Sequence, residues 1–233
     1  MRKYISRILW LFLIILLVGC DNNSSVTSTA LDGLSLLGLV DGRTLTYLQT
    51  DTTITVNPFN IEVTTSNQTI KITGSGDDWI IHNNNLPLIN LKIASSSIIQ
   101  NGYWRKVDSV DSIFYFATPP IIIKRSLSAH QSWQEFTPMY QSDSSQEMLP
   151  FYYAYFGFYS TKEYADTEEV LTPAGGFNAY RYDIKLYMNQ NDETPIATVS
   201  EFYVPHVGLV QWHFNSGPLK STLTLINYTD PTN

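Results

Sequence analysis

The chain has 233 residues, with 14 Lys and Arg against 21 Asp and Glu, and a formal net charge of −7. A surface this acidic repels phosphate backbones, which argues against nucleic acid as a partner. The chain has only one cysteine, so it cannot form an internal disulfide and must fold on its hydrophobic core alone.

The first 20 residues have the pattern of an export leader. Three basic residues precede an unbroken apolar run over residues 8–18, which is too short to span a bilayer but has the length of a signal-peptide core. The segment Leu17-Val18-Gly19-Cys20 follows it and resembles the lipobox of bacterial lipoproteins. The resemblance implies that residues 1–19 are removed and that the Cys20 thiol carries a diacylglycerol. The alternative is an ordinary leader, or a short anchor, in which Cys20 takes no part.

A lipid on Cys20 has two consequences. Acyl chains hold the protein on a membrane, because each buried methylene contributes about 0.8 kcal/mol. Removal of the leader leaves 11 basic and 21 acidic residues, a net charge of −10. We therefore expect a lipid-anchored protein of the bacterial cell envelope that faces the periplasm. Asp21 resembles the signal that retains lipoproteins in the inner membrane of enteric bacteria, and it favours that membrane over the outer one.

The chain downstream of the leader divides into a tether and one domain. Residues 20–43 comprise the lipidated cysteine and a tether, whose first part is rich in Ser, Thr and Asn. The leucine-rich stretch Leu31–Val40, interrupted by Gly33 and Gly38, predicts a short element that packs against the domain. Residues 44–233 are long enough for a single β-rich domain.

Apolar and polar residues alternate with a period of two from residue 44 onward, which is typical of β-strands. Short runs are bounded by turn residues at Asp41-Gly42, Asn57-Pro58, Ser66-Asn67 and Gly74-Ser75-Gly76. The spacing of about ten residues per strand, without a long amphipathic helix, predicts an all-β, mainly antiparallel fold. We expect a curved sheet that closes into a partial barrel or a sandwich.

Two segments of the last third carry a resemblance. Thr172–Tyr180 contains Pro-Ala-Gly-x-Phe, and Tyr203–Val210 contains Pro-x-Val-Gly-Leu-Val. Together they resemble a signature of uncharacterised bacterial envelope lipoproteins. The resemblance implies a curved sheet or partial barrel, somewhat like the lipoprotein carriers of the periplasm, and no activity. His206 stands where that pattern more usually has Gly, and Gly208 is expected to reverse the chain at positive φ.

Catalytic and metal motifs are lacking. The sequence contains no Gly-x-Ser-x-Gly, no His-Glu-x-x-His and no P-loop. His206 and His213 could approach each other across a hairpin, but a metal site needs at least three ligands. The Asp77-Asp78 pair lacks the alternating oxygen ligands of a calcium loop. We expect a protein that is not an enzyme and that holds no metal or cofactor.

The most aromatic stretch is Phe151–Tyr159. As a strand it would place Tyr153, Tyr155 and Tyr159 on one face, either within a sandwich core or along a ligand cavity. The tryptophans at positions 79, 104, 133 and 212 could likewise form a sugar-stacking platform or belong to the core.

Two functions remain open at this stage. In the first, the domain binds an apolar or amphipathic ligand in a barrel interior or groove lined by Tyr153, Tyr155 and Tyr159. In the second, it is a structural or assembly lipoprotein that docks on another envelope protein. A continuous apolar cavity of about 300 Å³ or more in the interior favours the first, and an interior packed at a density of about 0.74 favours the second.

Overall fold

A computed structural model describes residues 31–107, 110–116, 118–136 and 158–231. One short helix accompanies the strands in this part of the chain. The elements are β1 (Leu31–Asp32), α2 (Gly33–Leu36), β2 (Thr44–Val56), β3 (Phe59–Ser75), β4 (Asp78–Asn83), β5 (Leu86–Ile93), β6 (Ser97–Val107), β7 (Val110–Tyr115), β8 (Ile121–Lys124), β9 (Ser126–Leu127), β10 (Ser132–Phe136), β11 (Tyr159–Thr172), β12 (Gly175–Tyr187), β13 (Ala197–Val204), β14 (Gly208–Asn215) and β15 (Leu219–Thr229).

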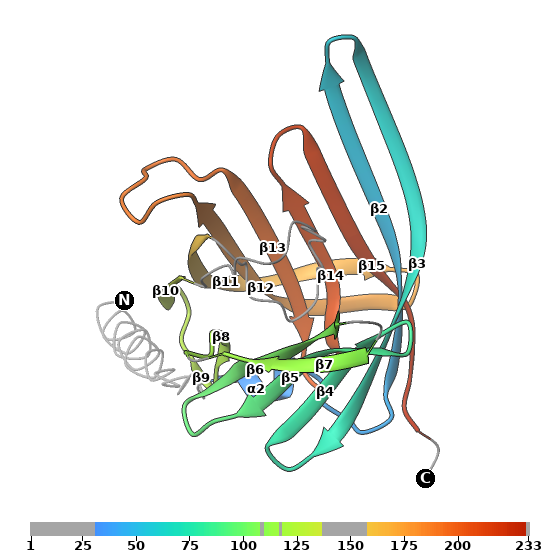
Figure 1. Ribbon diagram of the computed structural model, residues 1–233, viewed down its shortest axis with the longest axis vertical. Coiled ribbons are helices and arrows are strands. Elements are labelled where there is room, and N and C mark those ends of the chain that lie inside the picture. The colour runs from blue at the N-terminus through green and yellow to red at the C-terminus, as the bar shows by residue number, and fades with distance from the viewer. Residues whose placement is uncertain (1–30, 108–109, 117, 137–157, 232–233) are drawn as a thin grey trace, which may run out of the picture.

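A single 13-stranded antiparallel sheet forms the body, in the order β10-β11-β12-β13-β14-β15-β2-β3-β4-β5-β6-β7, with β8 paired to β6. Strands β2 and β3 join the two halves of the sheet, which curve toward each other (Figure 1). The end strands β7 and β10 do not pair with each other, so over the described residues the sheet is not closed. The predicted all-β fold is confirmed, and of the two expected forms it is the partial barrel.

The hairpin of β2 and β3 is longer than the sequence predicts. Ser66-Asn67 lies within β3, where these two residues pair with Gln49 and Leu48, and is not a turn. The expectation of short strands was therefore wrong here. Threonines on both strands explain the difference, because β-branched side chains favour the pleated conformation even where Ser and Asn interrupt the apolar pattern. The turn at Asn57-Pro58 is confirmed, between β2 and β3.

One buried cluster forms the core. Every long strand from β2 to β6 and from β11 to β15 contributes, and α2 adds Leu36 and Leu37, which are fully buried. The Asp32 side chain accepts a hydrogen bond from the Leu34 N–H and so caps α2. The prediction that Leu31–Val40 packs against the domain is confirmed.

Side chains bridge the two ends of the sheet where strand pairing is lacking. The Ile121 N–H of β8 donates to Glu135 of β10 at 2.6 Å, and Lys162 Nζ of β11 donates to the Ile121 carbonyl at 3.3 Å. Lys124 Nζ lies 5.3 Å from the centroid of the Trp133 ring. Burial raises the pKa of the Glu135 carboxyl, although Lys162 opposes the shift. These contacts hold β8 against β10 and β11.

The last third of the chain follows its predicted alternation. Tyr182, Ile184 and Leu186 of β12 are buried, and the residues between them are exposed or half-buried. Gly175 has φ 141° and Gly208 has φ 106°, so both turns use the positive φ expected of glycine.

Candidate ligand-binding groove

Most of the site residues predicted from the sequence fall in segments for which the structure gives no description. Cys20, Tyr153 and Tyr155 lie outside the described residues. Tyr159 is the first residue of β11 and is half-buried. Its ring stacks on Phe136 of β10, with the ring centroids 4.4 Å apart. Tyr159 therefore packs between two strands at the end of the sheet.

The tryptophans do not share one surface. Trp133 and Trp212 belong to the buried core, and Trp79 and Trp104 are half-buried.

A groove of about 350 Å³ lies between α2, one end of the β4–β5 pair and the β13–β14 turn. Its walls come from α2 and the segment after it, the start of β4, the end of β5 and the β13–β14 turn. They consist of Asp32, Leu34, Ser35, Gly38, Leu39, Val40, Gly76, Trp79, Ile93 and His206. We call this the α2 groove. The apolar side chains among them are half-buried, and the polar ones are few. Small-molecule sites have this composition.

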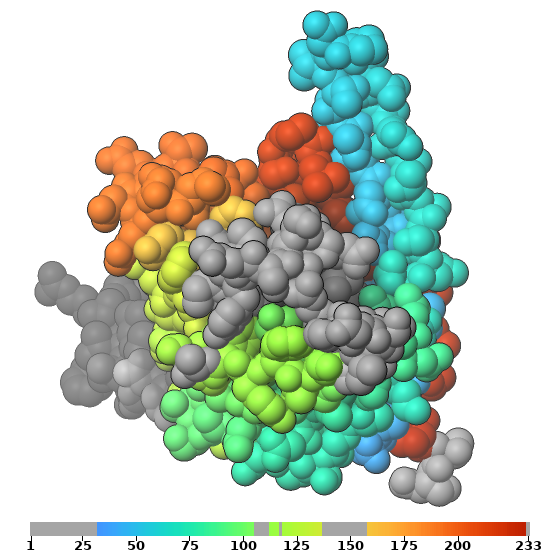
Figure 2. Space-filling view, in the orientation of Figure 1, coloured from blue at the N-terminus to red at the C-terminus, as the bar shows by residue number. Residues whose placement is uncertain are grey.

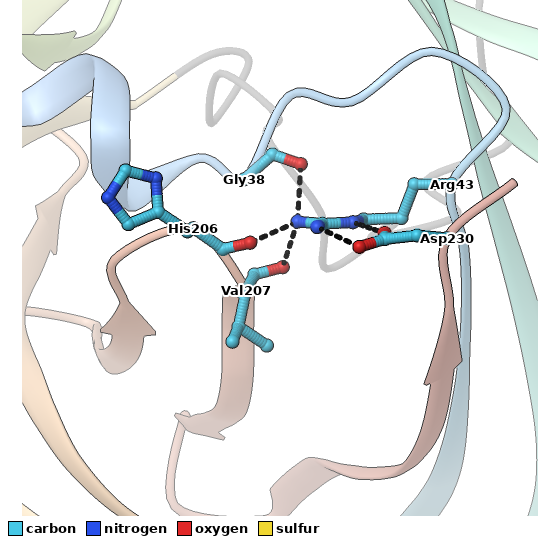
Figure 3. A network of polar contacts seen from close by, with 5 residues as sticks. All are labelled: Gly38, Arg43, His206, Val207 and Asp230. Atoms are coloured by element: carbon cyan, nitrogen blue, oxygen red, sulfur yellow. Dashed lines mark hydrogen bonds and ion pairs between the residues drawn. The ribbon is translucent and has the colours of Figure 1, made fainter. Parts of the chain in front are cut away.

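Arg43 is the centre of a network of polar contacts that includes Gly38 and His206, two residues of the groove wall (Figure 3). Its Nη1 donates to the carbonyls of Gly38 at 2.9 Å and of Val207 at 3.2 Å, and also to the carbonyl of His206. Its Nε and Nη2 donate to the two carboxylate oxygens of Asp230, at 2.5 and 2.9 Å. One buried guanidinium therefore ties together the segment after α2, the β13–β14 turn and the C-terminal end of the sheet.

Gly38 is required for this arrangement. Its φ is 56°, and a Cβ at this position would overlap the Val207 carbonyl. The segment after α2 can approach the β13–β14 turn this closely only because residue 38 has no side chain.

His206 adopts an unusual conformation at the rim. It is exposed and has φ 64°, in the left-handed region that residues other than glycine rarely occupy. Its N–H donates to the Ser35 carbonyl at 2.7 Å, and its own carbonyl accepts from Arg43. The backbone is thus held from both sides, and the imidazole extends away from the guanidinium (Figure 3). His206 lines the groove together with Asp32 and Ser35.

Asp32 is the acidic residue among those that line the groove, and Arg125 lies close enough to offset part of its charge. Arg125 Nε lies 3.7 Å from the Asp32 carboxylate, and both side chains are substantially exposed. The Ser35 hydroxyl donates to the Asp32 carbonyl at 2.7 Å. The groove can therefore offer an apolar wall for a hydrocarbon or ring and a small polar rim for a head group.

The two histidines considered as a metal pair do not form a site. His206 lies in the β13–β14 turn, whereas His213 is near the far end of β14, with its ring centroid 5.4 Å from that of Phe202. Burial lowers the pKa of His213. Within the described ranges no group of three or more His, Cys, Asp and Glu could hold a metal ion. The same part of the chain contains no helix long and apolar enough to cross a membrane.

The sequence did not single out Arg43 or the groove. Arg43 is one basic residue beside a turn, and its partners lie as far away as Asp230. The usable signals were weak: a glycine at position 38 after a leucine-rich stretch, and a histidine at position 206 where the resembled motif has glycine.

Comparison with known proteins adds fold-level similarity only. No family model matches the chain, and no curated protein matches it. A solved "putative lipoprotein" from Parabacteroides distasonis ATCC 8503 is 13% identical over 83% of this chain and 98% of that one, with a TM-score of 0.38. A "putative exported protein with YmcC-like fold" from Bacteroides fragilis NCTC 9343 is 14% identical over 86% and 100%, with a TM-score of 0.35.

A third solved structure is a beta-barrel-like protein of a domain of unknown function from Brucella abortus. It is 9% identical over 83% of this chain and 99% of that one, with a TM-score of 0.39. At such values none of the three resemblances carries an argument about function. The class is set by the fold and the groove themselves: an open, barrel-like antiparallel sheet with a small surface groove at one end.

Proposed function

We propose that this protein is a lipid-anchored lipoprotein of the bacterial cell envelope that binds, without catalysis, the apolar part of an amphipathic ligand in the α2 groove. The observation that carries the proposal is the groove itself. Its volume of about 350 Å³ falls in the range of small-molecule sites. Its half-buried leucine, valine, isoleucine and tryptophan side chains offer an apolar wall.

The strain at His206 supports a role in binding. A non-glycine residue in the left-handed region costs about 1–2 kcal/mol, and such strain clusters at functional sites. A glycine would satisfy the same backbone hydrogen bonds without that cost. We infer that contacts of the imidazole with the ligand compensate for this strain. The position of His206 at the rim suits a polar head group.

The place of the groove in the chain agrees with the proposed anchor. Asp32 and Leu34 lie on its wall, and only 11 residues separate Cys20 from Asp32. An extended chain of this length spans at most about 40 Å. A domain anchored at Cys20 would hold the groove within that distance of the bilayer, where amphipathic molecules are concentrated.

The first experiment tests the groove with N-phenyl-1-naphthylamine, an uncharged apolar probe that fluoresces when bound. Val40 lines the groove without belonging to the core cluster, so Val40→Glu should weaken binding at least tenfold with little loss of stability. Leu171 is 75% exposed and lies away from the groove, so Leu171→Glu is the matched control and should bind as wild type. Equal affinities of the two variants would refute the site.

The second experiment uses the strain at His206. His206→Gly should raise the melting temperature, because it removes the left-handed strain, and should weaken retention of lipid co-purified from the host membrane. Native mass spectrometry of the detergent-extracted protein measures that retention. A variant that is more stable and retains the same lipid would show that His206 has no role in binding.

The anchor has its own test. Cys20→Ser should leave an uncleaved precursor or a soluble product, because a serine oxygen cannot form the thioether. Membrane fractionation and the mass of the mature chain measure the outcome. Unchanged fractionation together with an unchanged mass would contradict the lipidation of Cys20.

A further inference from the structure

Asp32 carries the one formal charge among the described residues that line the α2 groove, with histidine counted as neutral. Its side chain is at the rim and exposed. The lining contains no Lys or Arg, the side chains that recognise phosphate, sulfate and carboxylate groups. The groove is therefore better suited to a positively charged head group than to an anionic one.

The segments next to the groove wall add further carboxylates. Asp41 and Asp77 each follow a wall residue directly in the chain, and both are exposed. The Asp41 carboxylate accepts the Gly74 N–H at 3.0 Å, which holds it beside the β3–β4 turn. Lys92 precedes a wall residue, but it is the cross-strand partner of Asp78, so the two charges offset each other. The charge around the groove is therefore negative.

Arg125 is the cation that competes for the Asp32 carboxylate. Its Nε lies 3.7 Å from Asp32 Oδ1, and the two side chains are 38% and 50% exposed. An ion pair between two exposed side chains contributes little stability, and Arg125 does not belong to the groove lining. A cation in the groove can therefore replace Arg125 beside Asp32.

Trp79 adds an aromatic surface to the wall. It is half-buried and lines the groove. Its indole N–H donates to the Gly76 carbonyl at 3.0 Å, which fixes the orientation of the ring. Ammonium groups bind to the faces of tryptophan rings, because the ring quadrupole attracts positive charge. Trp79 can thus contact a hydrocarbon chain and also favour a cation attached to it.

We propose that the α2 groove binds a cationic amphiphile, a hydrocarbon chain that ends in an ammonium group. The inference rests on the proposed function, since it names the head group of the ligand that the groove holds. The chain lies against the apolar wall, and the ammonium pairs with the Asp32 carboxylate at the rim. His206 contributes an acceptor, because a neutral imidazole has one ring nitrogen that can receive an ammonium N–H.

The test uses octylammonium, 1-octanol and octyl sulfate, which have the same chain and differ in the head group. The full-length protein is kept in one non-ionic detergent at about pH 8, where imidazole groups are uncharged. Ile93 lies on the groove wall, so the NMR signal of its methyl groups reports occupancy of the groove itself. Each probe is compared between variants, so that its partition into the detergent cancels.

The first variant is Asp32→Asn, which removes the charge but keeps the cap of α2, because an asparagine oxygen accepts the same N–H. It should bind octylammonium more weakly than wild type by about threefold or more, and 1-octanol equally well. The matched control, Glu193→Gln, removes an exposed carboxylate from the loop between β12 and β13. This loop lies well away from β4 and β5 in both views (Figures 1 and 2). The control should bind both probes as wild type does.

Three results would overturn the proposal. If wild type and Asp32→Asn bound octylammonium equally and still bound 1-octanol, the groove would be an apolar site without a preference for a cation. If Glu193→Gln weakened octylammonium binding as much as Asp32→Asn, the effect would be one of net charge. If no probe moved the Ile93 signal, the proposed function and this inference would both be wrong.

The second variant, Arg125→Gln, removes the competing cation. It should bind octylammonium about twofold more tightly than wild type, because Arg125 no longer offsets the Asp32 charge. Unchanged or weaker binding of octylammonium would contradict the proposal. So would octyl sulfate binding that Arg125→Gln weakens by about threefold or more, since that result would assign Arg125 to an anionic head group.

Discussion

Among the polar side chains, Arg43 is the one whose replacement should lower the free energy of unfolding most. It is 4% exposed, and its guanidinium bonds to three main-chain carbonyls and to Asp230. Arg43→Met keeps an unbranched apolar stem in the buried site but removes every donor. The variant leaves the carbonyls of Gly38, His206 and Val207 without this partner.

The expected magnitude follows from the exposure of each partner. Asp230 is 51% exposed, so its ion pair with Arg43 contributes only about 0–1 kcal/mol. The three carbonyls share Nη1, which has two hydrogens, so they amount to about two hydrogen bonds to a charged group, each about 1.5–3 kcal/mol. We expect Arg43→Met to lower the free energy of unfolding by about 3–7 kcal/mol. For a chain of this length, that corresponds to a fall of about 6–28 °C in the melting temperature.

Thermal unfolding followed by near-ultraviolet circular dichroism measures this fall. Asp230→Asn is the matched control, since it breaks the exposed ion pair and leaves the carbonyl bonds intact. It should lower the melting temperature by no more than about 4 °C. A melting temperature of Arg43→Met within about 2 °C of wild type would refute the reasoning. So would an Asp230→Asn variant as unstable as Arg43→Met.

Three further changes test other parts of the fold. Tyr47 and Tyr182 are both buried, but the Tyr47 hydroxyl donates to the Leu209 carbonyl at 2.7 Å, whereas the Tyr182 hydroxyl has no hydrogen-bond partner among the described residues. Tyr47→Phe should lower the free energy of unfolding by about 1–3 kcal/mol, whereas Tyr182→Phe should not lower it. Equal falls in the melting temperatures of the two variants would contradict this. Gly208→Val forces a β-branched side chain to φ 106° and should cost about 1–3 kcal/mol with membrane association unchanged, so a wild-type melting temperature would disprove the strain. Burial raises the pKa of the Glu135 carboxyl, so ionisation of this carboxyl destabilises the folded state. The free energy of unfolding should therefore rise as pH falls through the raised pKa and Glu135 becomes protonated. Glu135→Gln should remove this dependence, and an identical pH–stability profile would show that Glu135 is not its source.

The acid side of the stability profile has a second source. Hydrogen bonds from Arg43 lower the pKa of Asp230 below its usual range. A carboxyl with a depressed pKa stabilises the fold above its unfolded pKa, and this contribution is lost as pH falls through the lowered value. Its sign is opposite to that of Glu135, so the two variants should change the profile in opposite directions.

The sequence by itself determined the strand content and many of the turns. Alternation over short runs identifies strands because the two faces of a sheet differ in solvent exposure, and this depends only on neighbouring residues. Gly208 marked a turn for an equally local reason, since positive φ is a property of one residue. The leucines of Leu31–Val40 predicted a packed element because apolar side chains that close together must be covered.

Only the tertiary structure decided the length of the β2–β3 hairpin and the existence of the α2 groove. Ser66-Asn67 carries a turn composition, but pairing with β2 holds it in a strand. Arg43 lies 163 residues from His206 and 187 from Asp230 along the chain. Sheet order, which depends on the long-range pairing of β15 with β2, brings these residues together. Local pattern fixes which residues form strands, whereas a site built from distant backbone carbonyls has no side-chain signature that a sequence could display.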